Sequence, residues 1–149
     1  MRVGEVCNRE VVVVAKGASL LEAAKLMRSQ HVGTVVVVEE HDGNPIPVGI
    51  LTDRDMVIAL IAEEVPLSAV SVGDVMSFEL VIARESDGLF ATVEHMRDRG
   101  IRRLPVVAEN GSLVGILAVD DVLDLLAEQL NALVGLVACE RRREEQQRA

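Results

Sequence analysis

The stretch VGILTDRD at residues 48–55 decides the fold, because it returns along the chain as VGILAVDD at residues 114–121. A second motif, VGEV at residues 3–6, returns as VGDV at residues 72–75. The two motifs stand closer together in the second copy, so that copy has lost residues between them. A repeat of this kind indicates duplication of one structural unit, and each copy is expected to form the same small fold.

Each copy has the pattern of a strand, a helix, two strands and a closing helix. Short β-branched runs at residues 10–15 and 79–83 predict the first strands, and apolar residues spaced i, i+4 and i+7 after each run predict an amphipathic helix. The remaining strands are predicted at residues 35–38, 48–51, 104–107 and 114–117, and the closing helices from about residues 53 and 119. The residues missing from the second copy fall in the loop between its last two strands.

This order predicts an α/β (α+β) fold in two repeats. The predicted boundaries are residues 1–62 for the first repeat, 63–71 for a linker, 72–130 for the second repeat and 131–149 for a C-terminal helical extension. A unit of about 60 residues buries too little of its own apolar surface to be stable alone. The repeats are therefore expected to pack together about a pseudo-two-fold axis, which builds each crevice at the axis twice, with related but unequal walls.

Composition argues against nucleic acid as a partner. The 149 residues include 24 acidic and 15 basic side chains, for a formal net charge of -9, whereas binding to a phosphate backbone needs clustered Lys and Arg. Phe78 and Phe90 are the only aromatic residues, so the chain offers no series of rings on which bases could stack.

The sequence also lacks the motifs of common catalytic and metal sites. It contains no phosphate loop, dinucleotide fingerprint, HExxH or GxSxG pattern, and its three histidines do not pair with Cys or carboxylates at zinc-site spacing. We therefore predict a protein that is not an enzyme, with no metal and no catalytic cofactor. The two cysteines form no CxxC pair, the N-terminus shows no secretory pattern, and no window approaches a continuous apolar run of about 20 residues. These features predict a cytoplasmic protein with no membrane partner.

The junction between a strand and a helix at residues 49–55 is the candidate site, and it has two interpretations. Thr52 as N-cap with Asp55 as the third helical residue makes a capping box, which is sufficient structural reason for both residues. The same geometry displays free N–H groups, a hydroxyl and a carboxylate toward one crevice. Under this second interpretation, a carboxylate there can accept hydrogen bonds from both hydroxyls of a ribose, and Thr52 and the free N–H groups can donate to a phosphate.

The repeat order, together with the pattern Gly-hydrophobic-x-Thr/Ser-x-x-Asp, resembles the cystathionine-beta-synthase (CBS) domain, and a tandem pair of such domains forms a Bateman module. The resemblance covers residues 1 to about 130 and implies a cleft between the repeats for an adenosine-containing ligand such as AMP, ADP or ATP. It also implies that Asp55 contacts the ribose and that Thr52 lies near the ribose and phosphate. The second copy keeps Asp121 but has Ala118 in place of the hydroxyl, so its site is expected to be weaker or vacant.

In modules of this family the segment equivalent to residues 100–106 often supplies basic side chains to ligand phosphates. Here it contains Arg102 and Arg103, placed where a strand begins. Guanidinium groups suit phosphate oxygens, which the acidic field of the chain would otherwise repel. The alternative is that these arginines face solvent or pair with nearby acids such as Asp98.

The last predicted helix continues from Asp120 to about Gln147, with apolar residues spaced alternately by three and four over barely two heptads. Either this stripe folds back on its own repeat or it pairs with another subunit; the resemblance implies a homodimer, because Bateman modules commonly dimerise. The sequence thus predicts a non-catalytic sensor that binds an adenine nucleotide and reports occupancy to a client protein. The alternative is a ligand-free structural or interaction module, and a requirement for magnesium is left open.

Overall fold

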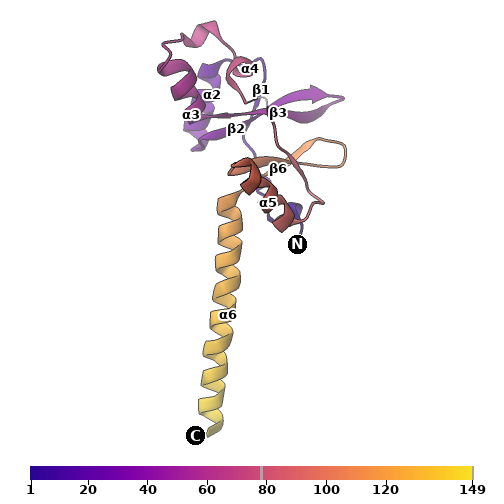
Figure 1. The fold of residues 1–149 in the computed structure, drawn as a ribbon, viewed down its shortest axis with the longest axis vertical. Helices are drawn as coiled ribbons and strands as arrows, with labels where there is room; N and C mark the ends of the chain where they lie inside the picture. The colour runs from indigo at the N-terminus through magenta and orange to yellow at the C-terminus, as the bar shows by residue number, and fades with distance from the viewer. Residues whose placement is uncertain (78, 149) are drawn as a thin grey trace.

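The computed structural model describes residues 1–77 and 79–148, and within them the chain forms two three-stranded sheets. The first sheet contains β1 (Val13–Ala15), β2 (Thr34–His41) and β3 (Asn44–Thr52), and the second contains β4 (Ala83–Arg84), β5 (Arg103–Val107) and β6 (Leu113–Ala118). In each sheet the first strand pairs in parallel with the second, which pairs antiparallel with the third. β3 and β6 face each other where the repeats meet (Figure 1).

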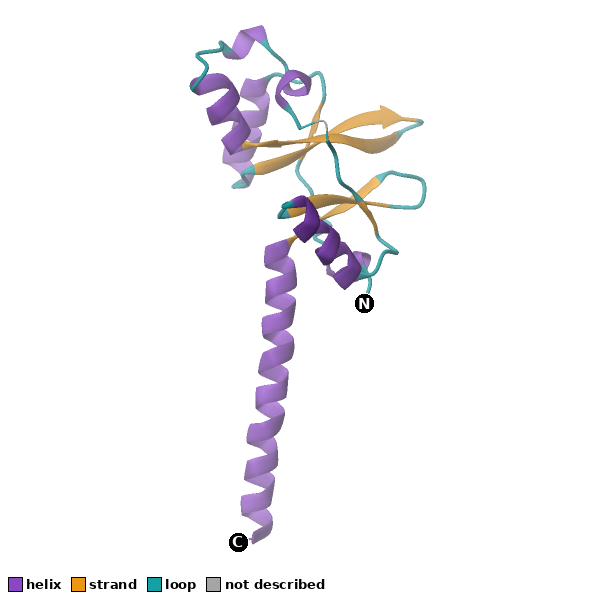
Figure 2. Ribbon diagram, in the orientation of Figure 1, coloured by secondary structure: helices purple, strands orange, loops and turns teal. Residues whose placement is uncertain are grey.

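Helices lie on the outer sides of the two sheets (Figure 2). The longer ones follow the predicted order, whereas the short helices before β1 and β4 were not predicted. The bounds of the helices are α1 (Val3–Val6), α2 (Leu20–Gln30), α3 (Asp53–Met56), a π-helical turn (Val57–Ile61), a 3-10 turn (Leu67–Ala69), α4 (Val72–Val75), α5 (Leu89–Arg99) and α6 (Val119–Arg148). α2 begins at Ser19, whose Oγ accepts a hydrogen bond from the Glu22 N–H at 3.1 Å. It ends at His31 in the left-handed conformation, the position that Gly100 takes at the end of α5. The predicted mixed α/β fold is confirmed.

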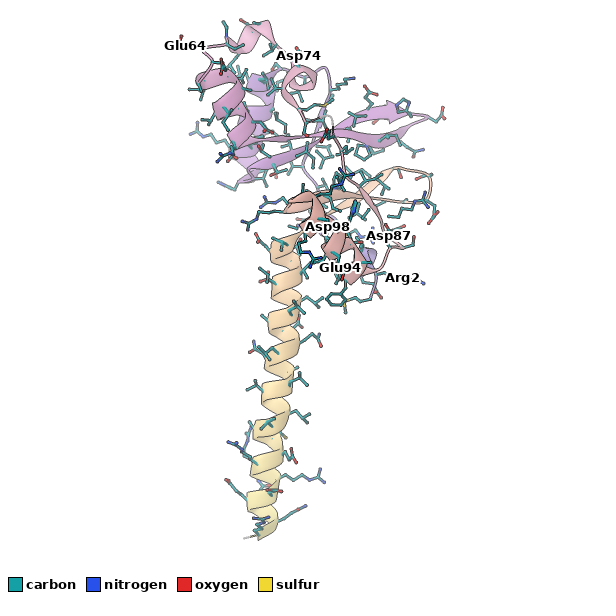
Figure 3. The ribbon with its side chains drawn as sticks, viewed as in Figure 1. Arg2, Glu64, Asp74, Asp87, Glu94 and Asp98 are labelled. Atoms are coloured by element: carbon teal, nitrogen blue, oxygen red, sulfur yellow. The ribbon has the colours of Figure 1, made fainter. Side chains whose placement is uncertain are left out.

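The two repeats exchange their first helices. Val3 and Cys7, from the start of the chain, lie in the apolar core of the second sheet, while Val72 and Met76 lie in the core of the first. The Val3 N–H donates to the Asp87 carbonyl at 2.9 Å, and Figure 3 labels Arg2 and Asp87 together on the second repeat. Because each core is closed by a helix from the other repeat, neither core is complete without both halves of the chain.

The segments that follow these helices cross between the sheets. Asn8 exchanges two backbone hydrogen bonds with Ile116 of β6, each 2.9 Å long, and the Ser77 N–H donates to the Ile50 carbonyl of β3 at 2.9 Å. A Cβ built at Gly49 would lie 2.9 Å from the Ser77 carbonyl oxygen. At Gly115 the same construction gives 2.9 Å to the Asn8 carbonyl oxygen, so only glycine allows the crossing backbone to approach this closely.

The exchange predicts different reactivities for the two cysteines. Burial raises the pKa of the Cys7 thiol, and its side chain packs over Gly115, whereas Cys139 is exposed on α6. A raised pKa means a smaller thiolate fraction near pH 8, and the thiolate is the reacting species. We expect Cys7 to react with a disulfide reagent at least about tenfold more slowly than Cys139 in the folded protein. Mass spectrometry of timed reactions measures both rates. Equal rates before unfolding in guanidinium would contradict the packing described here.

α6 continues well past the second sheet and projects away from both repeats (Figure 1). It is long and apolar enough to cross a membrane by length and composition, and few of its residues are buried. This differs from the sequence-based expectation that no segment of the chain is long and apolar enough to cross a membrane. This part of α6 is apolar only on average, because Asp124, Glu128 and Asn131 lie among its leucines and valines.

Candidate functional site

The predicted strand-to-helix junction opens into a pocket of about 290 Å³ between the two repeats. Its walls come from both copies: the start of β2, the end of β3 and α3 from the first, and the crossing segment before β4 and the start of β5 from the second. The residues that line it are Thr34, Ile50, Thr52, Asp55, Ser77, Glu79, Leu80, Val81, Ile101, Arg102 and Arg103. A molecule bound here would touch both repeats at once.

Thr52 and Asp55 form the predicted capping box at the mouth of this pocket. Asp55 Oδ2 accepts a hydrogen bond from the Thr52 N–H at 2.9 Å, and Thr52 Oγ1 accepts from the Asp55 N–H at 3.1 Å. Both residues are half-buried. Within the described residues, Asp55 Oδ1 accepts no hydrogen bond and the Thr52 hydroxyl donates none. The cap therefore leaves one acceptor and one donor for a ligand, so the two interpretations of this junction are compatible.

The two arginines lie on the wall that the second repeat contributes. The Nη2 atom of Arg102 lies 3.4 Å from Asp120 Oδ1, and the two side chains are 75% and 59% exposed, so solvent screens this pair and it restrains Arg102 weakly. Asp98, the acid predicted as an alternative partner, instead lies 3.5 Å from Arg97. Arg103 forms no ion pair with any residue that the structure describes. Its guanidinium is available to an anion.

The second strand-to-helix junction opens into a separate pocket of about 310 Å³. Asp121 lines it and accepts a hydrogen bond from the Ala118 N–H at 3.2 Å, as Asp55 does from Thr52, but position 118 has no hydroxyl to offer. Glu10 and Asp120 add two more acids to its lining, and Arg103 is its one arginine. The pocket is thus more acidic than the first and lacks one donor.

Arg103 and Thr34 line both pockets. They occupy matching places in the two repeats, because Thr34 pairs with Thr52 across the first sheet and Arg103 pairs with Ala118 across the second. The structure thus brings Thr52, Asp55, Arg102 and Arg103 to one pocket and places Asp121 in the other with Arg103. The Arg103 side chain thus borders both pockets, whereas Arg102 lines only the first, so the two pockets differ in charge.

Sequence reasoning missed the crossing segments as pocket walls. Residues 79–83 were expected to form a strand, but β4 contains only Ala83–Arg84, and Leu80 and Val81 line the first pocket instead. Residues 10–12 line the second pocket in the same way, and His31, at the end of α2, also lines it. The sequence offered one signal for these walls, because both runs follow a copy of the VGEV or VGDV motif. The motif shows that the two runs are equivalent, but it does not show which repeat each run contacts.

Other features of the described residues do not compete with this site. A wider depression of about 1010 Å³ lies between β1 and α4, on the first repeat, and a salt bridge of 3.3 Å between Lys16 and Glu39 crosses its lining. No group of three or more His, Cys, Asp or Glu side chains able to hold a metal ion is found in the described chain. The two strand-to-helix pockets are distinguished from the wider depression by the capping carboxylates Asp55 and Asp121 in their linings.

Comparison with known proteins places the chain in a family. The profile of the CBS domain matches residues 3–62 and again residues 72–128. An uncharacterized protein of Methanopyrus kandleri is 37% identical over 123 residues, which are 83% of this chain and 61% of that protein. A CBS domain-containing protein of Bacillus subtilis, YhcV, is 35% identical over 124 residues, covering 80% of this chain and 81% of the relative. This chain thus spans about three fifths of the first relative and four fifths of the second.

Solved structures agree with this assignment. A CBS domain protein from Pyrobaculum aerophilum complexed with AMP superimposes with a TM-score of 0.72 at 26% identity, over 81% of this chain and 89% of that one. The CBS domain pair of protein MJ0100, complexed with 5′-methylthioadenosine and S-adenosyl-L-methionine, gives a TM-score of 0.74 at 22% identity, over 87% and 98%. Two profile matches, two equivalent sheets and two equivalent pockets lead to one conclusion: this chain belongs to the CBS domain family, as a tandem pair.

Proposed function

We propose that the protein is a non-catalytic regulatory module that binds an adenine nucleotide in the pocket between its repeats. The observation that carries this proposal is the single pocket onto which Thr52, Asp55, Arg102 and Arg103 converge. Asp55 Oδ1 accepts the ribose hydroxyls, Thr52 donates to the first phosphate, and the arginines hold the phosphate oxygens. The AMP bound by the Pyrobaculum relative is a ligand of this class.

The remaining walls suit an adenine ring. Ile50, Leu80, Val81 and Ile101 line the same pocket, and each is half-buried, so a flat ring placed among them would remove apolar surface from water. No aromatic residue is among the described residues of this lining, which is consistent with a slot formed by aliphatic side chains.

Regulation follows from a ligand that contacts both halves. Asp55 and Thr52 belong to the first repeat, and Arg102 and Arg103 to the second, so occupancy favours the arrangement in which the two walls are closest. A client protein that contacts both repeats distinguishes the occupied from the empty form. We further propose that the protein acts in the cytoplasm as a homodimer, with the client as a separate partner.

Isothermal titration calorimetry of the full chain with AMP, ADP, ATP and adenosine tests this function. We expect saturable heat for at least one nucleotide, with one site per chain clearly stronger than the second because Ala118 removes a donor and the second lining is more acidic. Repeating the titration with and without Mg²⁺ settles whether a cation accompanies the phosphates. Absence of heat with all four ligands would instead favour a structural or interaction module.

The arginines give a graded prediction. Arg103→Gln is expected to weaken ATP binding about 10-fold, by loss of a charge-assisted hydrogen bond of about 1.5 kcal/mol, and to change adenosine binding little. Arg102→Gln is expected to have a smaller effect, because Asp120 already competes for its guanidinium. The measurement is the ratio of ATP to adenosine affinity for each variant. An equal loss for both ligands would remove these arginines from phosphate binding.

A further inference from the structure

One face of α6 carries apolar side chains that no part of the described chain covers. Leu123, Leu126, Leu130, Leu133 and Val137 recur at alternating spacings of three and four residues, which places them along one side of the helix. Their exposed fractions run from 46% to 62%. Figure 3 shows side chains projecting into open space along the length of α6. An uncovered apolar stripe of this length needs an occupant.

The other side of the helix argues against lipid as that occupant. Asp124, Glu128 and Asn131 lie opposite the stripe, so a membrane-spanning α6 would have to bury two carboxylates and an amide in hydrocarbon. The run that is apolar all round covers only residues 132–139, far short of the roughly 20 residues that span a bilayer. A narrow stripe beside a polar face is instead the pattern of a helix that pairs with another helix.

Charge along α6 selects the orientation of such a pair. Residues 120–128 contain four acids and no base, and residues 141–143 are three arginines. Continuing the stripe past Val137 brings Glu140 and Glu144 onto it. A parallel pair in register would therefore set each of these glutamates against its own copy, at cost to stability.

An antiparallel pair removes that conflict. With its centre between Asn131 and Ala132, Leu126 packs beside Val137 of the second copy and Leu130 beside Leu133 of the second copy. The arginines at residues 141–143 then lie along the acidic half of the second copy. Glu140 then lies beside Leu123 of the second copy and no longer faces its own equivalent.

We propose that α6 is the dimer interface of this protein, and that it pairs antiparallel with α6 of a second copy. The two CBS modules then lie at opposite ends of the paired helices. This inference specifies the interface of the proposed homodimer. It rests on α6 alone, so dimerisation and nucleotide binding are tested independently.

Light scattering after size exclusion tests the interface with the full chain. We expect a dimer for the natural sequence and a monomer for the double variant Leu126→Glu and Leu133→Glu, which places charges in the stripe. Asn131→Glu, on the polar side of the same helix, is the matched control and should remain dimeric. A monomeric natural chain, or a dimer that survives both stripe substitutions, would overturn the proposal. The monomeric variant should keep its nucleotide affinity, which separates the two failures.

Disulfide trapping tests the orientation. In a Cys139→Ser background, oxidation of a mixture of Leu126→Cys and Val137→Cys chains should yield a cross-linked pair, whereas neither variant alone should cross-link. Self-cross-linking of each variant alone would mean a parallel pair and would contradict the assignment. Flotation with phosphatidylcholine and phosphatidylglycerol vesicles is the last arm. One outcome would overturn the dimer: the natural chain binds the vesicles, the double variant does not, and no dimer forms in solution. The occupant of the stripe would then be a membrane.

Discussion

Replacing Asp55 by alanine is expected to weaken nucleotide binding about 10- to 100-fold, the largest loss of affinity for any single side chain of the first pocket. Hydrogen bonds to a charged acceptor contribute about 1.5–3 kcal/mol, and each 1.4 kcal/mol corresponds to about a factor of ten. The Oδ1 atom that the cap leaves without a protein partner is the one a ribose would use. Calorimetry with the nucleotide that gives the strongest heat measures the loss.

Two controls separate binding from folding. Asp55 also accepts the Thr52 N–H at 2.9 Å and is an acid in the first helical turn, so its removal costs helix stability of about 0.3–1 kcal/mol, which thermal unfolding reports. Asp121→Ala removes the equivalent cap acceptor in the second repeat and should lower stability similarly while leaving the strong site nearly unchanged. If both variants lose nucleotide affinity equally, Asp55 acts only through the fold and the proposed ribose contact is wrong.

The site could be predicted from the sequence where its signal was local. A Thr52 to Asp55 cap needs only residues close together along the chain, and the structure has it as expected. The repeat added the one long-range fact, because two copies that pack about an axis bring the start of β5 to the pocket of the first copy. Arg102 and Arg103 lie there.

The rest depends on pairings that no local pattern records. α1 and α4 have nearly the same sequence, VGEV and VGDV, so each would fit either core equally well by composition. Gly49 and Gly115 hold matching places in the two cores and each admits a crossing backbone equally closely, so they do not distinguish the two helices. A lone glycine in a strand suggests close backbone contact, but it does not name the partner.

The largest stability effect is expected at that approach. Gly49→Ala should lower the free energy of unfolding by about 1–3 kcal/mol, the usual cost of overpacking, because its Cβ would meet both the Met76 side chain and the Ser77 carbonyl oxygen. The Met76 side chain can move, but the Ser77 carbonyl belongs to the backbone segment that crosses between the repeats. Chemical denaturation followed by circular dichroism measures the change. Gly17→Ala is the matched control, since Gly17 has open space around its Cβ position, and should stay within about 0.5 kcal/mol of the natural chain.

The same substitution also connects the crossing to the pocket. The Ser77 N–H donates to the Ile50 carbonyl at 2.9 Å, and both residues line the first pocket. A crossing segment that moves away from Gly49 therefore widens this pocket. Gly49→Ala should therefore reduce nucleotide affinity as well as stability, whereas Gly115→Ala, at the crossing that borders the second pocket, should reduce stability with little effect on the strong site. If Gly49→Ala and Gly115→Ala weaken nucleotide binding equally, the two crossing segments are coupled. The prediction that each segment shapes only its own pocket would then be wrong.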